Sequence, residues 1–476
     1  MSAVETLITN AYLVLEASSE LPADAAEPQA GGPTQVEAAQ AAGREIDGGW
    51  IALAGGRVHS AGTAADPQPQ AQRTLDAGGR LVTPGLVNSH HHMYQNLTRA
   101  YAPAVNGSLF QWLTTLYPKW AALDEESVYL STYIAAAELI QGGCTTSSDH
   151  MYVHPKPRLI DAQIRAVREV GFRFMANRGS MTRSVEDGGL PPKSVVQDEQ
   201  AILEDSERLI GSYHDAGPGA MTRVALAPCS MFSVTEEIMR ATAQLAEKHS
   251  VRLHTHLAED KDEDTYALEV YGRRPVEYLE DVGWATDRTW VAHYVYGSDD
   301  ESRRLAAAGV SATQCPSSNM ILCGDAADAK TLRGMGMSIG VGCDGSASAD
   351  SADLWQETRG AMLLGRLKHG PAEFSARDAL NMATRGSAAN LGWDDELGRI
   401  RPGDCADLVV WQSAPLTQLG SFTDPVEGWL RSGPAKAWHT FINGQQVLES
   451  GQLQLPALED TISGHTKAAR AMQGLA

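Results

Sequence analysis

The feature that most constrains the fold of this chain is a regular alternation of short apolar runs with longer helix-type segments from residue 84 to residue 395. The apolar runs that read as strands lie at 143–146, 173–176, 224–227, 251–254, 290–293, 310–314 and 339–342. Segments with helical periodicity separate them, for example 128–140, 235–248 and 353–368. Because strands that alternate with helices form parallel sheets, the pattern predicts an α/β fold, a (β/α)8 barrel of the TIM type.

An open, doubly wound sheet is the alternative arrangement of the same elements. Such sheets often bind nucleotides, but the chain contains no P-loop. The pattern therefore favours the barrel, in which the carboxyl ends of the strands carry the chemistry.

The two ends of the chain share a different pattern, in which short strand-type runs alternate with glycine turns. These runs occupy 7–15 and 50–54 near the N-terminus, and 406–411 and 441–447 near the C-terminus. We expect them to pair in one small β-sandwich domain made of residues 1–83 and 396–476, with the barrel formed by residues 84–395. The stretch 17–43 is rich in Ala, Pro, Gly, Glu and Gln, so we expect a mobile insertion without a folded element.

The composition indicates a soluble protein with a small partner. Of 476 residues, 43% are hydrophobic, which is enough for a large core, and the formal net charge of −21 argues against nucleic acid or an anionic membrane as a partner. The six cysteines are dispersed without a CxxC pair, which predicts reduced thiols in the cytoplasm. The sequence shows no signal peptide, and no apolar stretch approaches the roughly 20 residues that cross a bilayer. We expect a homo-oligomer, a dimer or larger.

Three consecutive histidines follow the apolar run 81–87. Residues i and i+2 of an extended backbone point to the same side, so His90 and His92 are positioned to bind one ion while His91 faces away. A surface cluster of histidines is the alternative. The internal position and the hydrophobic flanking sequence favour a metal site.

A second cluster lies at 253–259 and contains His254, His256 and Glu259. The alternation of a strand places both histidines on one side, so spacing alone does not decide which of them is a ligand and which is a packed neighbour. Glu259 follows His256 by three residues, close enough to reach a substrate bound at the metal and to act as an acid.

Two further polar residues end apolar runs. His293 follows 290–292 and is a candidate for polarising the reacting group, with a buried core histidine as the alternative. Asp344 opens a loop of small residues at 345–348 and is a candidate ligand, with a helix cap or turn former as the alternative. These clusters converge only if the barrel forms.

The segments 84–92, 256–259, 292–293 and 344–348, in this order, resemble the amidohydrolase superfamily in its branch of mononuclear-zinc aminohydrolases. Within that branch the chain is most similar to bacterial 8-oxoguanine deaminases, through the segments 112–118, 178–181, 188–192, 205–210, 227–230 and 315–320. The s-triazine aminohydrolases that act on hydroxyatrazine are similar in fewer segments. Three positions depart from the family pattern: Ile321 stands where a basic residue is usual, Tyr294 where Gly or Cys is common, and Ala349 where Asn is usual.

The resemblance implies the roles of individual residues. The ligands of one Zn²⁺ per chain would be His90, His92, His256 and Asp344; Glu259 would protonate a ring nitrogen, and His293 would polarise the attacking water or the tetrahedral intermediate. Binuclear relatives carry a lysine on the fourth strand, and 225–232 contains none. For substrate binding, the resemblance implies Gln95 as a purine contact, with Trp112 and Arg178 as candidates for stacking and oxygen recognition.

The implied reaction is the zinc-dependent hydrolytic deamination of an amino-substituted heterocycle, with 8-oxoguanine giving uric acid and ammonia. One alternative is removal of an N-alkylamine from an s-triazine at the same site. Another is a non-catalytic assembly protein of the same fold. A residue that can bind metal stands at every implied ligand position, which argues against this alternative. The signature of the other zinc base deaminases, H-x-E with P-C-x-x-C, is absent from the sequence.

Overall fold

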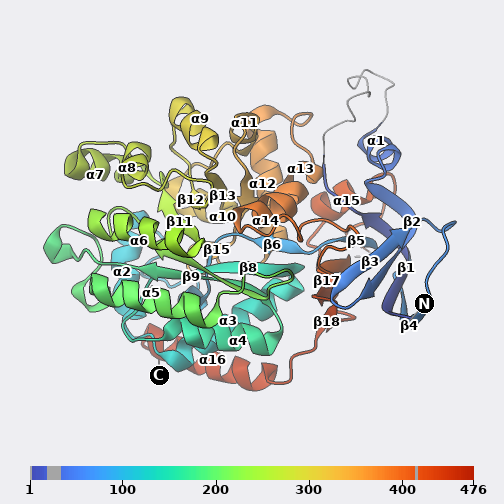
Figure 1. Cartoon of the computed structure of the whole chain (residues 1–476), viewed down its shortest axis with the longest axis horizontal. Coiled ribbons are helices and arrows are strands. Elements are labelled where there is room, and N and C mark those ends of the chain that lie inside the picture. Colours follow the sequence, from blue (N-terminus) through green and yellow to red (C-terminus); the bar gives the residue numbers. More distant parts are fainter. Residues whose placement is uncertain (1–2, 19–33, 413–415, 476) are drawn as a thin grey trace.

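The computed structural model describes residues 3–18, 34–412 and 416–475. Figure 1 shows a helix-covered barrel, which contains the middle of the chain, beside a β-rich region that contains the N-terminus. Among the described residues, no helix combines the length and the apolar character needed to cross a membrane.

The barrel is built on an eight-stranded sheet in which every neighbouring pair is parallel. In sheet order the strands are β14 (Ile339–Val341), β13 (Ser311–Gln314), β12 (Thr289–His293), β11 (Arg252–Leu257), β10 (Thr222–Pro228), β9 (Arg173–Ser180), β8 (Cys144–Met151) and β6 (Leu86–Asn88). The first and last strands meet where the amide of Ser89 donates to the carbonyl oxygen of Val341 over 3.1 Å. Two short strands, β7 (His91–His92) and β15 (Asp344–Gly345), pair beside this closure. The predicted (β/α)8 fold is confirmed.

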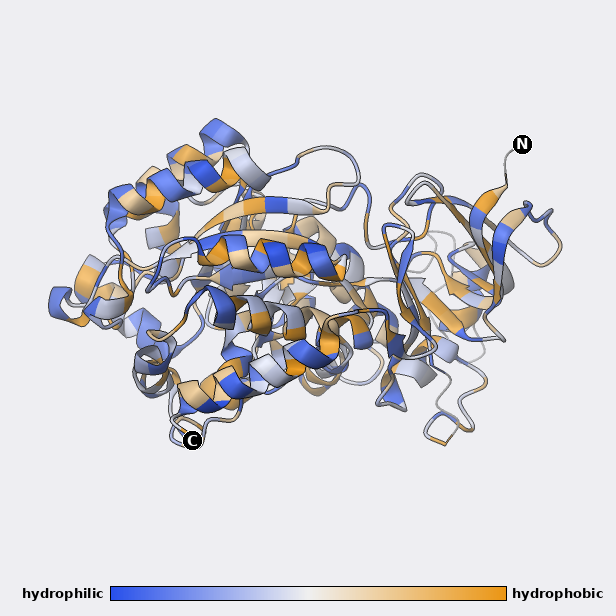
Figure 2. Ribbon diagram, turned by 90° about the horizontal axis from the view of Figure 1, so that it is seen from below, coloured by the Kyte–Doolittle hydropathy of each residue, from blue (hydrophilic) through white to orange (hydrophobic). Residues whose placement is uncertain are grey.

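Helices connect the barrel strands and cover the sheet. They are α3 (Glu125–Gln141), α4 (Leu159–Val170), α5 (Glu199–Tyr213), α6 (Glu236–His249), α7 (Lys261–Tyr271), α8 (Pro275–Asp281), α9 (Asp299–Ala307), α11 (Ala329–Gly334) and α12 (Leu354–His369). In α6 the Thr235 side chain caps the amide of Ile238, and acidic residues fill the first turn and basic residues the last, as the helix dipole favours. Figure 2 shows the resulting amphipathic pattern, with hydrophobic and hydrophilic residues alternating along the helices. The predicted segments 128–140, 235–248 and 353–368 fall within α3, α6 and α12 or one residue beyond them.

Both ends of the chain contribute to a nine-stranded sheet. Its strands are β1 (Val4–Val14), β2 (Glu45–Ala54), β3 (Arg57–Gly62), β4 (Ala71–Asp76), β5 (Leu81–Pro84), β16 (Leu408–Trp411), β17 (Ala437–Ile442), β18 (Gln445–Glu449) and β19 (Gln452–Leu453). β16 from the C-terminal part pairs with β5 from the N-terminal part, and residues of both parts, such as Ile8, Leu53 and Phe441, share one buried core. The predicted pairing of the two ends is therefore confirmed.

The prediction that 17–43 lacks a folded element is wrong for α1 (Gln35–Ala41). Thr34 and Glu37 form a capping box: the Thr34 hydroxyl accepts the amide of Glu37, and the Glu37 carboxylate accepts the amide of Thr34 over 2.8 Å. Ala38 and Ala39 are buried, so one face of this helix packs on the protein. Residues 19–33 of the same stretch lie outside the described residues.

The barrel and the end sheet are joined by buried contacts. The guanidinium of Arg173 on β9 donates two hydrogen bonds to the carboxylate of Asp407, next to β16, and both side chains are buried. Gly143 has a positive φ of 82° and lies against the Trp411 ring, where any Cβ would collide with it. The boundary between the barrel and the end domain at 395/396 remains a prediction. The last helix, α16 (Leu458–Gln473), follows this boundary in the chain and packs against α3 on the barrel.

Candidate metal centre and active site

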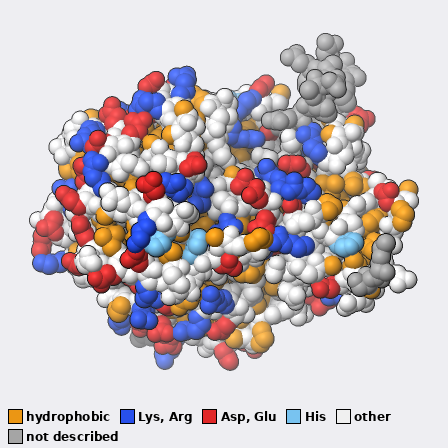
Figure 3. All heavy atoms as spheres, viewed as in Figure 1, with side chains coloured by type: hydrophobic (Ala, Val, Ile, Leu, Met, Phe, Trp, Pro, Cys, Tyr) orange, Lys and Arg blue, Asp and Glu red, His pale blue; other side chains and the backbone are white. Residues whose placement is uncertain are grey.

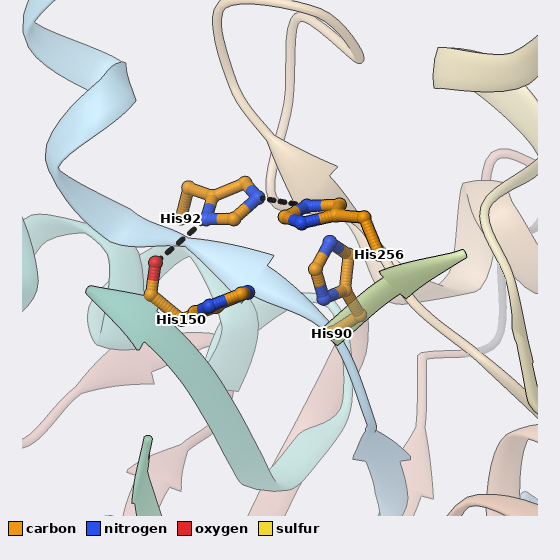
Figure 4. A group of neighbouring side chains, drawn as sticks. All are labelled: His90, His92, His150 and His256. Atoms are coloured by element: carbon orange, nitrogen blue, oxygen red, sulfur yellow. Dashed lines mark hydrogen bonds between the residues drawn. The ribbon is translucent and has the colours of Figure 1, made fainter. Parts of the chain in front are cut away.

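The polar residues predicted from the sequence lie together at the carboxyl end of the barrel strands. His90 follows β6, His92 ends β7 and His256 lies on β11. His293 is the last residue of β12, and Asp344 is the first residue of β15. All five are buried, and Figure 4 shows His90, His92 and His256 turned toward one another.

Backbone hydrogen bonds decide which ring nitrogen of His92 and His256 carries the proton. Nδ1 of His92 donates to the carbonyl oxygen of His150, and Nδ1 of His256 donates to that of Cys229, each over 2.7 Å. Because a neutral imidazole has a single N–H, Nε2 of each ring is left with a bare lone pair. The two Nε2 atoms lie 3.2 Å apart, and Asp344 Oδ1 lies 3.2 Å from Nε2 of His92.

His90 is oriented by a neighbouring imidazole. Nδ1 of His254 donates to the carbonyl oxygen of Trp290 over 2.9 Å, so Nε2 of His254 accepts the Nδ1 proton of His90 over 2.8 Å. Nε2 of His90 is therefore bare. It lies 3.3 Å from Asp344 Oδ1 and has no hydrogen-bond partner among the described residues. Of the two histidines that spacing did not separate, His256 directs Nε2 to this point, whereas His254 lies behind His90.

Three bare ring nitrogens and one carboxylate oxygen, all of them acceptors, thus meet in a buried space. Their lone pairs repel one another unless positive charge lies between them, and burial removes the water that would screen this repulsion. Burial also lowers the pKa of His90 and His256 well below the usual value, which keeps both rings neutral. Since neutral imidazole and carboxylate are ligands that Zn²⁺ prefers, the donor set fits this ion.

His150 is a member of the cluster that sequence reasoning missed. A nitrogen of its ring lies within 4.8 Å of the ligand atoms that His90, His92 and His256 offer (Figure 4). Its Nε2 donates to the carbonyl oxygen of Ala227 over 2.8 Å, while its buried Nδ1 has no hydrogen-bond partner in the described part of the chain. The predicted strand stopped at 146, whereas β8 runs to Met151. A prediction that extended this strand to 151 would have placed His150 near its carboxyl end, where the other candidate residues lie.

Hydrogen bonds hold the Asp344 carboxylate in one orientation. The hydroxyls of Ser318 and Ser348 donate to Oδ2 over 2.6 and 3.2 Å, which leaves Oδ1 directed at the imidazoles. His91, which was predicted to face away from the metal, donates its Nδ1 proton to the backbone carbonyl of Asp344. The third histidine of the run therefore fixes the position of the aspartate.

The backbone around the site adopts conformations that L-residues avoid. Ala258, His293, Tyr294 and Asp344 have positive φ values of 51°, 69°, 51° and 54°. Each costs on the order of 1–3 kcal/mol, and such conformations cluster where a fold positions functional groups. Tyr294 stands where Gly or Cys is expected and adopts this backbone conformation as well. Its hydroxyl forms a hydrogen bond with that of Ser302 over 3.2 Å.

Glu259 and His293 form a second pair beside the imidazole cluster. Asn319 donates its side-chain amide to Nδ1 of His293 over 3.1 Å, so the proton of this ring is on Nε2, 3.5 Å from Glu259 Oε1. Burial raises the pKa of Glu259 well above its usual value, and the charges of Asp344 and Glu263 raise it further. Both effects favour the protonated form of the Glu259 carboxyl, which lies next to an imidazole N–H.

A small pocket with a cavity volume of about 30 Å³ lies over these groups. Its lining includes His92, His256, Glu259, His293 and Asp344, together with Gln95, Leu109, Trp112, Leu113, Tyr117, Tyr152, Cys229, Phe232 and Leu322. Trp112 is anchored by a hydrogen bond from its ring N–H to the carbonyl oxygen of Ala347 over 3.1 Å. Gln95 packs so closely on Gly345 that a Cβ there would collide with its amide oxygen. Two of the three predicted substrate contacts thus lie in the pocket.

Arg178 is the third, and it is not among the described residues that line this pocket. Its guanidinium donates to Asp205 over 2.8 Å, to Gln197 over 3.2 Å and to the carbonyl oxygen of Gly179. A turn of this side chain toward a ligand would break these hydrogen bonds. A role of Arg178 in recognising a substrate oxygen stays a prediction.

Comparison with known proteins places this architecture in a family. The sequence model described as "Amidohydrolase family" matches residues 81–447. The chain belongs to the amidohydrolase family.

Among amidohydrolase relatives, the 8-oxoguanine deaminase of Pseudomonas aeruginosa is 45% identical over 432 residues, which are 90% of this chain and 96% of that protein. The hydroxydechloroatrazine ethylaminohydrolase of a Pseudomonas species is 34% identical over 407 residues, 83% of this chain and 82% of that protein. An atrazine chlorohydrolase variant from Arthrobacter aurescens, crystallised with zinc and atraton, superimposes with a TM-score of 0.87 at 29% identity and covers 98% of this chain and 100% of that one.

Proposed function

We propose that this protein is a zinc-dependent aminohydrolase that converts an amino-substituted heterocycle, 8-oxoguanine, to uric acid and ammonia. The observation that carries the proposal is the convergence of three bare imidazole nitrogens and a carboxylate oxygen beside the buried carboxyl of Glu259, whose pKa is raised by burial. In this proposal His90, His92, His256 and Asp344 hold one ion per chain. The relatives that are deaminases and the neighbour crystallised with zinc support it.

Zn²⁺ held by these four residues would supply a nucleophile at neutral pH, because it lowers the pKa of water to about 7. Asp344 would accept the first proton of the attacking water, because Ser318 and Ser348 hold its carboxylate in position. It later delivers this proton to the amino group, which leaves as ammonia.

Glu259 acts on the heterocycle. Its carboxyl gives a proton to the ring nitrogen next to the carbon that is attacked, so that this carbon becomes electrophilic. The N–H of His293 donates a hydrogen bond to the oxygen that becomes the product carbonyl. When the C=O bond forms and ammonia departs, the second proton of the water restores Glu259, so the protons balance.

The second candidate function is the release of an alkylamine from an s-triazine. The 34% identity to an ethylaminohydrolase and the similarity to triazine hydrolase structures favour it. The same zinc, Glu259 and Asp344 would serve, and only the leaving group and the pocket would differ.

The test is a substrate panel on zinc-loaded protein. With 8-oxoguanine we expect uric acid and ammonia, and with an N-ethyl hydroxytriazine we expect little ethylamine. Faster release of ethylamine would favour the second function, and no turnover of either compound would refute both. An Asp344→Asn variant, measured in parallel, shows whether the activity belongs to this site.

We further propose a cytoplasmic, homo-oligomeric protein with no nucleic-acid partner. All six cysteines are free, as in a reducing compartment, and the face in Figure 3 shows acidic and basic side chains interspersed with no continuous basic region. The oligomeric state stays a prediction, which light scattering on the purified protein tests directly.

A further inference from the structure

Tyr117 has a buried hydroxyl that the proposed mechanism does not use. The side chain has no exposed surface and lines the pocket with Glu259 and His293. Its hydroxyl has no hydrogen-bond partner among the described residues. A buried polar group left in this state costs on the order of 1–3 kcal/mol, so the site is incomplete without a partner.

Helix α2 (Leu109–Trp120) brings Tyr117 to the pocket. Leu109, Trp112 and Leu113 line the pocket from the same face of the helix, as spacings of three and four residues require. The hydrogen bond from Trp112 to Ala347 ties this helix to the loop that follows Asp344. The fold therefore holds Tyr117 at the border of the ligand space.

Besides Tyr117, the polar side chains that line the pocket are five of the proposed chemistry together with Gln95, Tyr152 and Cys229. His92, His256, Glu259, His293 and Asp344 belong to the proposed chemistry. Gln95 Oε1 is buried and, within the described parts of the chain, also lacks a hydrogen-bond partner. An amide oxygen is only an acceptor, whereas a phenol also donates, so the two together suit a ligand that carries a ring N–H and a carbonyl.

We propose that the Tyr117 hydroxyl donates a hydrogen bond to a carbonyl oxygen of the bound heterocycle and selects oxo-substituted rings. This inference rests on the proposed function and extends it by naming the chemical group of the substrate that the pocket recognises. Burial raises the pKa of Tyr117 well above its usual value, so the phenol keeps its proton and remains a donor at working pH. In 8-oxoguanine the candidate oxygens are those on C6 and C8.

The test compares wild-type protein and Tyr117→Phe on three substrates: 8-oxoguanine, guanine, which lacks the C8 oxygen, and 2-amino-8-oxopurine, which lacks the C6 oxygen. We expect kcat/KM to fall roughly tenfold on the two substrates that carry the contacted oxygen and to change less than about twofold on the third. The substrate that is spared identifies the oxygen. An equal loss on all three substrates, or no loss on any, would overturn the proposal.

Tyr278→Phe is the matched control. The Tyr278 side chain is equally buried and its hydroxyl also has no hydrogen-bond partner among the described residues, but Tyr278 lies on α8 and is not among the described residues that line the pocket. We expect its rates on the three substrates to equal those of the wild type.

If the wild-type protein deaminates none of the three substrates, the proposed function fails and Tyr117 is tested by binding alone. Quenching of tryptophan fluorescence, for which Trp112 is well placed, then reports the affinity for uric acid. We expect Tyr117→Phe to bind uric acid roughly tenfold more weakly than the wild type. Equal affinities, or no binding to either protein, would contradict the inference.

Discussion

At the scale of single residues, Glu259 has the clearest assigned task. Glu259→Gln keeps the size of the side chain but removes the proton that the ring nitrogen needs, so we expect turnover to fall by roughly 10² to 10⁴. Zinc content should stay near one per chain, because Glu259 is not a proposed ligand. Turnover and metal content measured on one preparation test this, and near-wild-type turnover would remove Glu259 as the acid.

The neighbouring histidines His254 and His256 allow a sharper comparison. His256→Ala removes a proposed ligand, so we expect the protein to lose most of its zinc. His254→Ala removes only the acceptor that orients His90, and we expect weaker zinc binding by roughly 10- to 100-fold, with occupancy restored by excess zinc. Competition with a chelator measures both affinities. Equal behaviour of the two variants would contradict the assignment drawn from the ring hydrogen bonds.

The sequence allowed the prediction of residues whose chemistry and position coincide, such as the histidines and the aspartate that end apolar runs. It did not reveal the direction of each ring nitrogen, because that depends on carbonyl oxygens of other strands, at His150, Cys229 and Trp290. The hydrogen-bond partners of Arg178 were hidden for the same reason. Its partner Asp205 lies on α5, and no local pattern joins the two.

At the scale of elements, the contact between barrel strand β9 and the end sheet depends on the Arg173–Asp407 pair. Arg173→Met leaves a buried carboxylate without its main partner, so we expect a loss of about 3–5 kcal/mol in the free energy of unfolding. Arg165→Met, which breaks the exposed pair with Glu125, should cost less than about 1 kcal/mol. Urea unfolding of the two variants and the wild type measures the difference. Similar losses in the free energy of unfolding would contradict a stabilising role of the buried pair.

Periodicity located the barrel strands because their cores are continuously apolar, but it misjudged where they end. β8 continues past residue 146 through Ser147 and Asp149, which are buried although they are polar. α1 escaped prediction because a stretch rich in small and polar residues contains only one capping box and two buried alanines. Such short helices depend on the surface that they pack against.

At the scale of the whole molecule, the alternation of strands and helices and the matching patterns at the two ends predicted the barrel and the association of the two chain ends, which β5 and β16 make in the structure. The position of α16 was not predictable. Its place on the barrel depends on specific contacts, such as His465 with Asn96 over 2.8 Å and Gln473 with the carbonyl oxygen of Leu97 over 2.9 Å. These pairs join residues that are far apart in the chain.

The central claim is that one zinc ion, held by this cluster, makes the protein a deaminase of 8-oxoguanine. The most direct measurement titrates metal-free protein with Zn²⁺ and follows the rate of uric acid formation from 8-oxoguanine. The account predicts a rate that rises in proportion to added zinc and reaches its plateau at one equivalent per chain. A plateau only at two equivalents, a rate independent of zinc, or no uric acid at any zinc concentration would contradict it.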